Sequence, residues 1–383
     1  MSELPRTLRL FQALLIDRMT PQFHSLKIHQ VTPQAGDAVR VCLEVPEVLR
    51  PAYAFQAGQY LTLKASIEGQ TLRRSYSLCS AEADFAKTGR LEVGVKRVEG
   101  GLFSNFAMRL RPGDSLEVMT PEGRFGSKAK AGEHLVAFVA GSGITPILSL
   151  MRSHLAASLH TRFTLVYGNR RVDSMMFLED HAALKNLYLG RVRLYHVLSR
   201  QPQEVELFNG RIDAAKVRAF TDQLVPTSSI DQSFICGPNS MIDEVEQALL
   251  KAGLAPNKIH TERFGTPGEH RSTPSKAVAL EDANAPAAKL VVVLDGKRSE
   301  MRLPFGDGKT GAKVLDIALA QGLDLPFACK GGVCCTCRAR VLEGEVVMEK
   351  NYTLEKDEIA KGFVLTCQAM AKSELVVISY DDR

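Results

Sequence analysis

Apolar and polar residues alternate with a period of two along the first part of the chain. The alternation covers 25–28, 39–45, 60–63 and 91–95, and turn residues separate these segments. A period of two predicts β-strands with one face toward a core and the other toward solvent. Because several such strands precede any long helical pattern, the sequence predicts an antiparallel β-barrel over residues 20–127.

A continuous apolar run at 134–140 begins a different pattern. A run of this kind predicts a strand that is buried on both faces, as in a parallel sheet. Further short apolar strands alternate with helical patterns after it. The strands are expected at 163–167, 192–197 and 234–235, and the helices at 144–150 and 176–187. This alternation predicts a doubly wound α/β domain with a parallel sheet over 128–264.

The last third of the chain contains a predicted tether and a third domain. Residues 265–287 are rich in Pro, Ser, Ala, Thr and charged side chains without sustained periodicity, which predicts an exposed linker. A strand-like run at 290–294, the turn Asp295-Gly296 and an apolar helical pattern at 314–319 then follow. We expect an α+β domain over 288–383.

Composition and charge narrow the function classes. The 383 residues are too many for one core and suggest two or three domains. The net charge is only +5, and no basic stripe with interleaved aromatic residues occurs, which argues against nucleic-acid binding. No apolar run approaches 18 residues, so no membrane span is expected. The segment 8–16 is interpreted as an extension or a short amphipathic helix rather than a signal peptide, and a cytoplasmic location is expected.

Four cysteines in the third domain have the spacing of an iron-sulfur ligand set. Cys329, Cys334 and Cys337 form C-x4-C-x2-C, and Cys367 follows alone. This spacing is typical of plant-type [2Fe-2S] clusters, in which four thiolates hold two irons. A structural zinc ion is the alternative, but zinc sites usually carry C-x2-4-C knuckles in pairs. Cys335 lies outside the spacing, and we expect that it is not a ligand.

The run 73–78, R-R-S-Y-S-L, carries groups that suit a flavin dinucleotide. A guanidinium neutralises a pyrophosphate, a phenol ring packs on a flat heterocycle, and a hydroxyl hydrogen-bonds a ring nitrogen. A glycine turn at 100–105 then opens an apolar helical pattern, and a helix N-terminus is a phosphate site. The run and the turn together predict a flavin site. For Tyr76 taken alone, a half-buried strand tyrosine is the alternative.

The α/β domain carries two motifs at expected strand ends. The run at 134–140 leads into G-S-G-I-T-P at 141–146, where glycines let the backbone approach a pyrophosphate and a proline suits the first turn of a helix. The C-G-P run at 236–238 again ends an apolar strand and begins a helix. Both therefore lie at the carboxyl edge of the predicted sheet, where ligands bind in such folds. The alternative for Cys236 is a buried thiol at a strand end.

The second strand of this domain ends in arginines rather than in an acid. Arg170 and Arg171 stand where an adenosine ribose is expected, and Ser199-Arg200 follows the third strand. NAD enzymes often present an acid at this position, whereas arginines suit a 2′-phosphate. The sequence therefore favours NADPH over NADH.

In this order, the motifs resemble the ferredoxin-NADP reductase superfamily, and the segment 290–377 resembles the β-grasp fold of plant-type ferredoxins. The resemblance implies a set of cofactor contacts. They are phosphate binding by Arg74, flavin packing by Tyr76, contact near the reactive flavin nitrogen by Ser77, diphosphate binding by Gly101 and Ser104, nicotinamide nucleotide binding by Gly141, Gly143, Thr145, Pro146, Arg170, Ser199, Arg200, Cys236, Gly237 and Pro238, and cluster ligation by Cys329, Cys334, Cys337 and Cys367.

The resemblance also identifies candidate residues beside the reacting rings. Ser77 and Cys236 are the candidate catalytic residues, and hydride transfer requires apposed rings rather than a covalent nucleophile. Phe264 is expected near the flavin, with Glu262 beside it, and a simple core aromatic is the alternative for Phe264.

From about Phe23 to its end, the chain resembles the FAD, NAD and [2Fe-2S] reductases of multicomponent oxygenases. The resemblance implies transfer of electrons from NAD(P)H through FAD and the cluster to a partner oxygenase. Its motifs are most similar to those of phenylacetyl-CoA epoxidase reductases. The alternatives are a reductase of a steroid or alkane hydroxylase and a redox-sensing iron-sulfur flavoprotein.

An acidic stretch lies between the third and fourth cysteines of the set. Such a stretch is usually a solvated face, and a docking patch for a partner is the alternative. Its residues are Glu343, Glu345, Glu349, Glu355, Asp357 and Glu358.

Overall fold

The computed structural model describes residues 21–35, 37–128, 130–265, 286–306, 308 and 311–382. The chain divides into two compact units, one from Phe23 to Phe264 and one in the C-terminal region that follows it. The segment 8–16 and nearly all of the predicted linker lie outside the described residues. No helix within the described ranges is long and apolar enough to cross a lipid bilayer.

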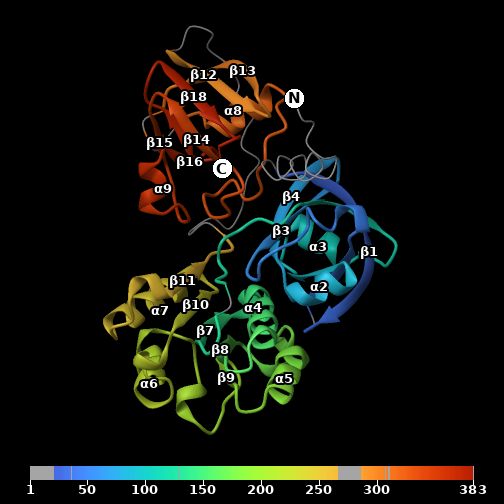
Figure 1. The fold of residues 1–383 in the computed structure, drawn as a ribbon, viewed down its shortest axis with the longest axis vertical. Helices are drawn as coiled ribbons and strands as arrows, with labels where there is room; N and C mark the ends of the chain where they lie inside the picture. Colours follow the sequence, from blue (N-terminus) through green and yellow to red (C-terminus); the bar gives the residue numbers. More distant parts are fainter. Residues whose placement is uncertain are drawn as a thin grey trace, which may run out of the picture. The chain divides into compact units, whose positions relative to one another are not determined.

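Six antiparallel strands form the predicted barrel at the start of the first unit (Figure 1). Their order is β4-β3-β6-β1-β2-β5, and a bridge between Leu78 and Val93 connects the end of β4 with β5. Inward-facing residues such as Leu26, Val41 and Leu63 are fully buried and form one apolar core. The strands are β1 (Phe23–Gln34), β2 (Ala38–Glu44), β3 (Tyr60–Ile67), β4 (Gln70–Ser77), β5 (Arg90–Lys96) and β6 (Ser115–Met119).

Two short helices accompany the barrel. The glycine turn at 100–101 opens α3 (Leu102–Ala107), as expected. The helix α2 (Glu82–Thr88) was not predicted. It is seven residues long and buries only Phe85, so it leaves almost no apolar periodicity in the sequence.

A five-stranded parallel sheet forms the rest of this unit, in the order β11-β10-β7-β8-β9. Figure 1 shows α4 and α5 on one side of the sheet and α6 and α7 on the other, and a separate apolar core lies under each pair. The elements are β7 (His134–Ala140), α4 (Ile144–Ala157), β8 (Arg162–Asn169), α5 (Leu178–Leu187), β9 (Val192–Leu198), α6 (Ala214–Gln223), β10 (Gln232–Cys236), α7 (Asn239–Lys251) and β11 (Ile259–Glu262).

The helix predicted at 176–187 begins two residues later, at Leu178. Phe177 has a φ of +57°, in the left-handed region, so the chain turns before the helix begins. Met176 and Phe177 are nevertheless buried in the core. Because these two buried residues continue the apolar spacing of the helix, the sequence predicts a start of α5 that is two residues too early.

The barrel and the parallel sheet pack together within one unit. Cys79 and Phe125, on the barrel side, belong to the same apolar core as Ile147 and Leu148 of α4. The ring of Phe125 also meets Phe234 of β10 edge to face, with the ring centres 5.6 Å apart. This shared core brings a loop of the barrel against the carboxyl half of the sheet.

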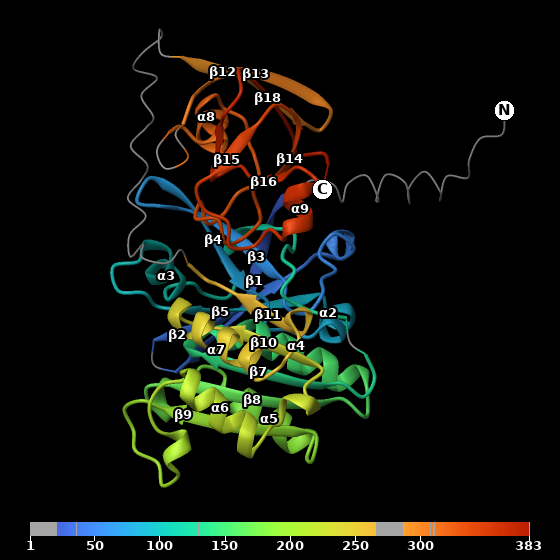
Figure 2. The same cartoon turned by 90° about the vertical axis from the view of Figure 1, so that its left-hand side faces the viewer.

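The C-terminal unit is a mixed sheet in the order β13-β12-β18-β14-β16, with β12 and β18 parallel. In Figure 2, β12, β13 and β18 lie side by side. The turn between β12 and β13 contains Asp295 and Gly296, as predicted, both with positive φ. The elements are β12 (Ala287–Leu294), β13 (Lys297–Pro304), α8 (Val314–Ala320), β14 (Arg338–Glu343), β15 (Val346–Met348), α9 (Lys356–Ala360), β16 (Phe363–Leu365), β17 (Ala369–Ala371) and β18 (Leu375–Ser379).

Candidate functional site

The predicted flavin residues lie on the last half of β4. Arg74 and Tyr76 share one face of the strand because side chains alternate between faces. The Arg74 guanidinium is exposed and donates to the carbonyl of Arg73 at 2.7 Å. The Tyr76 ring lies 5.8 Å from the ring of Phe103 on α3, and burial raises the pKa of its phenol. Strand β4 therefore presents a cation and an aromatic ring side by side.

The turn before α3 is held by Ser104. Its hydroxyl accepts a hydrogen bond from the Val98 amide at 3.1 Å and lies within hydrogen-bonding distance of the Val98 and Gly101 carbonyls. The side chain is 6% exposed. Gly101 is the residue before the helix, and a Cβ there would lie 2.7 Å from the Ser104 hydroxyl. The serine hydroxyl thus shapes the turn, and diphosphate binding by this turn stays a prediction.

Ser77, Glu262 and Cys236 meet at the junction of the barrel and the parallel sheet. The Ser77 hydroxyl donates to a carboxylate oxygen of Glu262 at 3.3 Å across 185 residues of sequence. Cys236 and Glu262 are paired residues on the neighbouring parallel strands β10 and β11. Glu262 therefore stands beside Cys236 in the sheet and meets Ser77 of the barrel.

Burial controls the protonation of this group of residues. Desolvation raises the pKa of Glu262 to about 8, and the hydrogen bond from Ser77 opposes part of the rise. Desolvation, together with the Glu262 carboxylate, raises the pKa of Cys236 well above its usual range. Cys236 is fully buried and carries a neutral thiol at neutral pH. A neutral thiol is a poor nucleophile, which agrees with the expectation that Cys236 does not act as one.

The two predicted glycine motifs of the sheet lie against each other. A Cβ on Gly143 would lie 2.3 Å from the carbonyl oxygen of Cys236, so only glycine allows this approach. The phenol of Tyr167, on β8, donates to the carbonyl of Gly141 at 2.9 Å. The Thr145 hydroxyl donates to the Ser142 carbonyl at 3.0 Å. The turn at 141–146 is thus held by contacts with β8 and β10 and by a hydrogen bond within the turn itself.

The remaining residues of these motifs occupy the expected edge. Pro146 is buried in the first turn of α4, and Pro238 directly precedes α7. A Cβ on Gly237 would approach the Ala140 amide nitrogen to 3.2 Å, at the end of β7. The carboxyl ends of β7 and β10 are therefore in close backbone contact.

Arg170, Ser199 and Arg200 come together beyond the carboxyl ends of β8 and β9. The Arg200 amide donates to the Arg170 carbonyl at 2.8 Å, and the Ser199 amide to the Asn169 carbonyl at 3.0 Å. Both Arg170 and Arg200 are exposed. Arg171, by contrast, pairs with Asp173 at 3.2 Å. Arg170 and Arg200 therefore share this edge of the sheet, whereas Arg171 already has a counter-charge in Asp173.

Phe264 stands two residues beyond Glu262 and is 47% exposed, so it is not a core aromatic. The sequence points to Glu262 only weakly. Its signal is an acid at the end of a short β-rich segment, and no local pattern reveals the serine that it meets.

The cysteine loop of the second unit places its four predicted ligands in two pairs. The Cys334 thiol interacts with Cys329, and the Cys367 thiol interacts with Cys337. In the described part of the chain, no group of three or more His, Cys, Asp or Glu side chains is arranged to hold a metal ion. The four thiols, in two pairs, suit a [2Fe-2S] cluster, because its four thiolates are shared between two irons.

Backbone amides of the loop point toward sulfur. The Gly331 amide donates to the Cys329 sulfur at 3.2 Å, and the Gln368 side chain donates to the Cys367 sulfur at 3.6 Å. A hydrogen bond from Cys334 and the amides of the loop lower the pKa of Cys329. Hydrogen bonds to sulfur stabilise the thiolate form that iron requires. The donor set and its surroundings thus fit the cluster.

The shape of the loop depends on left-handed backbone. Gly332 has a φ of +78°, and a Cβ there would lie 3.1 Å from the Lys350 carbonyl. Cys335 has a φ of +57°, and its side chain packs against the apolar core of this unit. Cys329 is exposed, whereas Cys337 and Cys367 are buried. One thiol pair therefore faces the surface and the other faces the core.

Three of the six acids in the stretch after the loop have counter-charges. Lys313 pairs with Glu349 at 2.7 Å, Arg338 with Glu358 at 3.1 Å, and Lys361 with Asp357 at 3.3 Å. Glu358 is buried. These internal counter-charges reduce the net charge that the stretch offers to a partner, which favours the interpretation as a solvated face.

Three sequence families match successive parts of the chain. Residues 25–126 match the oxidoreductase FAD-binding domain, residues 138–247 the oxidoreductase NAD-binding domain, and residues 304–372 the 2Fe-2S iron-sulfur cluster binding domain. The chain is therefore an oxidoreductase with binding domains for FAD, a nicotinamide nucleotide and a [2Fe-2S] cluster, as the sequence predicts.

Full-length relatives have the same organisation. The chain is 42% identical over 363 residues to a component of the 1,2-phenylacetyl-CoA epoxidase of Escherichia coli (strain K12), covering 94% of this chain and 98% of the relative. It is 33% identical over 359 residues to the ferredoxin reductase component of 3-ketosteroid-9-alpha-monooxygenase of Rhodococcus rhodochrous, covering 93% and 96%.

A solved structure with the same three-part fold is phthalate dioxygenase reductase, described as a modular structure for electron transfer from pyridine nucleotides to [2Fe-2S]. It is 23% identical with a TM-score of 0.54, and the match covers 93% of this chain and 98% of that one. The chain belongs to the family of FAD-, nicotinamide- and [2Fe-2S]-binding reductases that includes this component of the 1,2-phenylacetyl-CoA epoxidase.

Proposed function

We propose that this chain is the reductase component of a multicomponent oxygenase of the phenylacetyl-CoA epoxidase type, with NADPH as electron donor. The observation that carries the choice of partner is the similarity to the Escherichia coli epoxidase component along almost the whole length of both chains. We also propose 20–127, 128–264 and 288–383 as the domain limits, with 265–287 as linker. A cytoplasmic location is supported by eight cysteines without disulfides.

The reaction requires a converter between two-electron and one-electron carriers. When bound, FAD would supply the hydride chemistry and the [2Fe-2S] cluster the one-electron chemistry that this conversion needs. In our proposal, Arg74 and the turn at Gly101 hold the flavin pyrophosphate, and Tyr76 packs on the flavin ring. Four cysteines, Cys329, Cys334, Cys337 and Cys367, hold the cluster. The exposed Cys329 marks the side that faces the acceptor.

The junction of Ser77, Glu262 and Cys236 is the proposed place of hydride transfer. The Ser77 hydroxyl would position the reactive edge of a bound flavin, and the neutral Cys236 thiol would pack on the nicotinamide. Glu262, with a pKa of about 8, can hold a proton at the Ser77 hydroxyl near neutral pH. Gly141, Gly143, Thr145 and Pro146 carry the nucleotide pyrophosphate on the first turn of α4.

Arg170 and Arg200 are the proposed ligands of the 2′-phosphate of NADPH. Two exposed guanidiniums at neighbouring strand ends suit a dianionic group. Ser199 adds a hydroxyl between them. Gly237, Pro238 and Phe264 complete the nicotinamide end of the site.

The partner is tested by reconstitution. The purified chain, with its flavin, iron and sulfide quantified, is mixed with the other components of a phenylacetyl-CoA epoxidase, and consumption of NADPH is followed with and without phenylacetyl-CoA. Substrate-dependent consumption supports the proposal. Coupling only to a steroid hydroxylase instead favours the second candidate, to which the 33% identical relative points. Failure to reduce cytochrome c or an oxygenase at enzyme rates would favour the redox-sensing alternative.

A further inference from the structure

The seam between the barrel and the nicotinamide domain contains a ring of four charged side chains. Each domain supplies one arginine and one carboxylate: Arg40 on β2 and Glu92 on β5, and Arg152 on α4 and Asp180 on α5. Arg152 contacts Glu92 at 3.2 Å and Asp180 at 2.5 Å. Arg40 contacts Asp180 and, at 3.8 Å, Glu92. The charges alternate around the ring, and two of its contacts cross the seam.

The ring is shielded from solvent but not dry. The four side chains are between 14% and 23% exposed. At this exposure, attraction between charges is stronger than in a surface pair. Loss of one member leaves each of its two neighbours partly buried with one counter-charge instead of two, which adds a desolvation cost to the loss of the attraction. A change at one member therefore affects two contacts of the ring.

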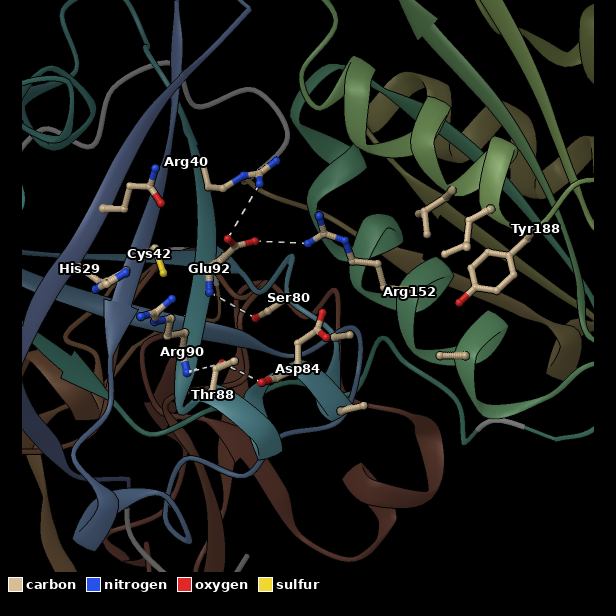
Figure 3. Close-up of a pocket in the computed structure, with 16 residues that line it drawn as sticks. His29, Arg40, Cys42, Ser80, Asp84, Thr88, Arg90, Glu92, Arg152 and Tyr188 are labelled. Carbon is tan, nitrogen blue, oxygen red and sulfur yellow. Dashed lines mark hydrogen bonds and ion pairs between the residues drawn. The ribbon is translucent and has the colours of Figure 1, made fainter.

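Apolar packing does not close the seam at this edge. A cavity of about 450 Å³ opens beside the ring, and Arg40, Glu92 and Arg152 are among the residues that line it, together with Leu184 and Tyr188 of the nicotinamide domain. Figure 3 shows Arg40 and Arg152 both reaching the carboxylate of Glu92. Polar contacts rather than interlocking side chains thus bridge the two domains here.

Elsewhere along the seam, the two domains are in close contact at the nucleotide turn. A Cβ on Gly94 of β5 would lie 2.7 Å from the Thr145 side chain and 2.9 Å from the ring of Phe177. The Arg40 guanidinium also lies 4.9 Å from the centre of that ring. The contact between Gly94 and this turn leaves no room for one methyl group. A small rotation of one domain would therefore change the contact.

Helix α4 connects the ring to the reacting groups. It begins at the turn that is proposed to hold the nucleotide, and its Arg152 donates to the Cys79 carbonyl at 2.8 Å. Ser149, one turn earlier, donates to the Ser80 carbonyl at 2.7 Å. Cys79 and Ser80 lie just after Ser77 in the sequence. The distance from Ile144 to Arg152 along a rigid helix is only ~12 Å, so a shift at the ring moves the turn as well.

We propose that Arg40, Glu92, Arg152 and Asp180 are positioning residues that fix the nucleotide turn relative to the flavin strand and thereby set the rate of hydride transfer. The inference rests on the proposed path from nicotinamide to flavin. The four residues act through α4 and the Cys79–Ser80 segment. Reacting rings must approach within about 3–3.5 Å, so a displacement of about 1 Å lowers the rate about 100-fold.

The test uses the full chain with its FAD and cluster. Arg152→Met removes a guanidinium of the ring, and Asp180→Asn keeps the shape of a carboxylate while removing its charge. Reduction of the flavin by NADPH is followed anaerobically by stopped-flow absorbance over a range of NADPH concentrations. We expect the limiting rate to fall at least ~10-fold in Arg152→Met and less in Asp180→Asn. The apparent Kd for NADPH should change by less than about twofold, because the turn proposed to hold the pyrophosphate moves as a unit with α4 and the proposed 2′-phosphate ligands lie elsewhere.

Arg191→Met is the matched control. Arg191 donates to the carbonyls of Leu155, Ser158 and Thr161, all within the nicotinamide domain. Its loss should lower the melting temperature and leave the limiting rate unchanged. If Arg191→Met slows reduction as much as Arg152→Met does, the effect is one of stability and the positioning role is refuted.

Two further outcomes separate this inference from the proposed function. A wild-type limiting rate in Asp180→Asn and in any folded Arg152→Met protein overturns the inference and leaves the proposed function intact. Failure of NADPH and NADH to reduce the flavin of the wild-type protein overturns both. If Arg152→Met does not fold, Asp180→Asn decides, with a fall in the limiting rate at unchanged Kd as the supporting result.

Discussion

Replacement of Gly143 by alanine tests whether the nucleotide turn and the Cys236 loop must touch. Gly143 has φ −59° and ψ −10°, which any residue adopts, so alanine adds no backbone strain. The whole effect comes from one methyl group, which would lie 2.3 Å from the Cys236 carbonyl oxygen and 2.6 Å from its carbonyl carbon. Ordinary contacts begin at 3.4 Å. The two backbones must therefore separate by about 1 Å, since neither atom belongs to a flexible side chain.

A shift of this size at the reacting rings lowers the rate of hydride transfer about 100-fold, which corresponds to about 2.7 kcal/mol in the barrier. Overpacking itself costs about 1–3 kcal/mol of stability. For a unit of this size, each kcal/mol lowers the melting temperature by about 2–4 °C. The assays are anaerobic stopped-flow reduction of the flavin by NADPH and thermal melting of the same preparation.

The matched control is Gly168→Ala, on the neighbouring strand β8. A Cβ there meets the flexible end of Ile212 at 3.1 Å and lies 3.5 Å from the Val139 carbonyl, so the backbone can stay in place. We expect its flavin to be reduced at the wild-type rate. A Gly143→Ala protein that melts and reacts like the wild type would show that the close approach of the two loops has no functional consequence.

Three further predictions concern the ends of the electron path. Arg200→Ala should raise the KM for NADPH about tenfold and leave the KM for NADH unchanged, because it removes a charged contact to the 2′-phosphate. The control Arg171→Ala should change neither KM, because Arg171 pairs with Asp173. Equal changes with both nucleotides in Arg200→Ala would contradict the proposed contact. Burial raises the pKa of Glu262 from 4.5 to about 8, so the unfolded chain loses this proton at a lower pH than the folded chain, and stability falls as pH rises between these values. The variant Glu262→Gln should flatten the decline in melting temperature across that range. Parallel pH profiles of the variant and the wild type would rule out the raised pKa. Cys329→Ser should lose most of its iron and sulfide, whereas Cys335→Ser should keep both. Iron and sulfide quantitation, together with the visible spectrum, measures the loss. Loss of the cluster in Cys335→Ser would show that Cys335 is a ligand.

Several parts of the fold follow from local sequence alone. The alternating segments near Val41 and Leu61 became barrel strands, and the continuous run at 134–140 became the central strand of the parallel sheet. These patterns are readable because burial on one face or on both faces leaves a period in the sequence. The cysteine spacing is local in the same sense, since three of the four ligands belong to one loop.

Elements without such a period were predicted less well. The short helix α2 buries a single residue, and the start of α5 was misplaced by buried residues that precede a left-handed turn. The sequence also does not show which charged side chains form ion pairs. Only the structure shows that Arg171 has a partner in Asp173 and that Glu349 and Glu358 have partners in Lys313 and Arg338.

The sequence by itself determined the inventory of this protein: a barrel, a parallel sheet, a cysteine loop and the motifs that each carries. Tertiary structure decided which groups meet. Ser77 reaches Glu262 across 185 residues, and Arg40 reaches Asp180 across 140 residues. Neither pair has a signature in the chain, because a contact between distant residues depends on how two domains dock. The docking rests on a shared apolar core and on close approach at glycines such as Gly94 and Gly143, and both are properties of surfaces in contact rather than of any single segment.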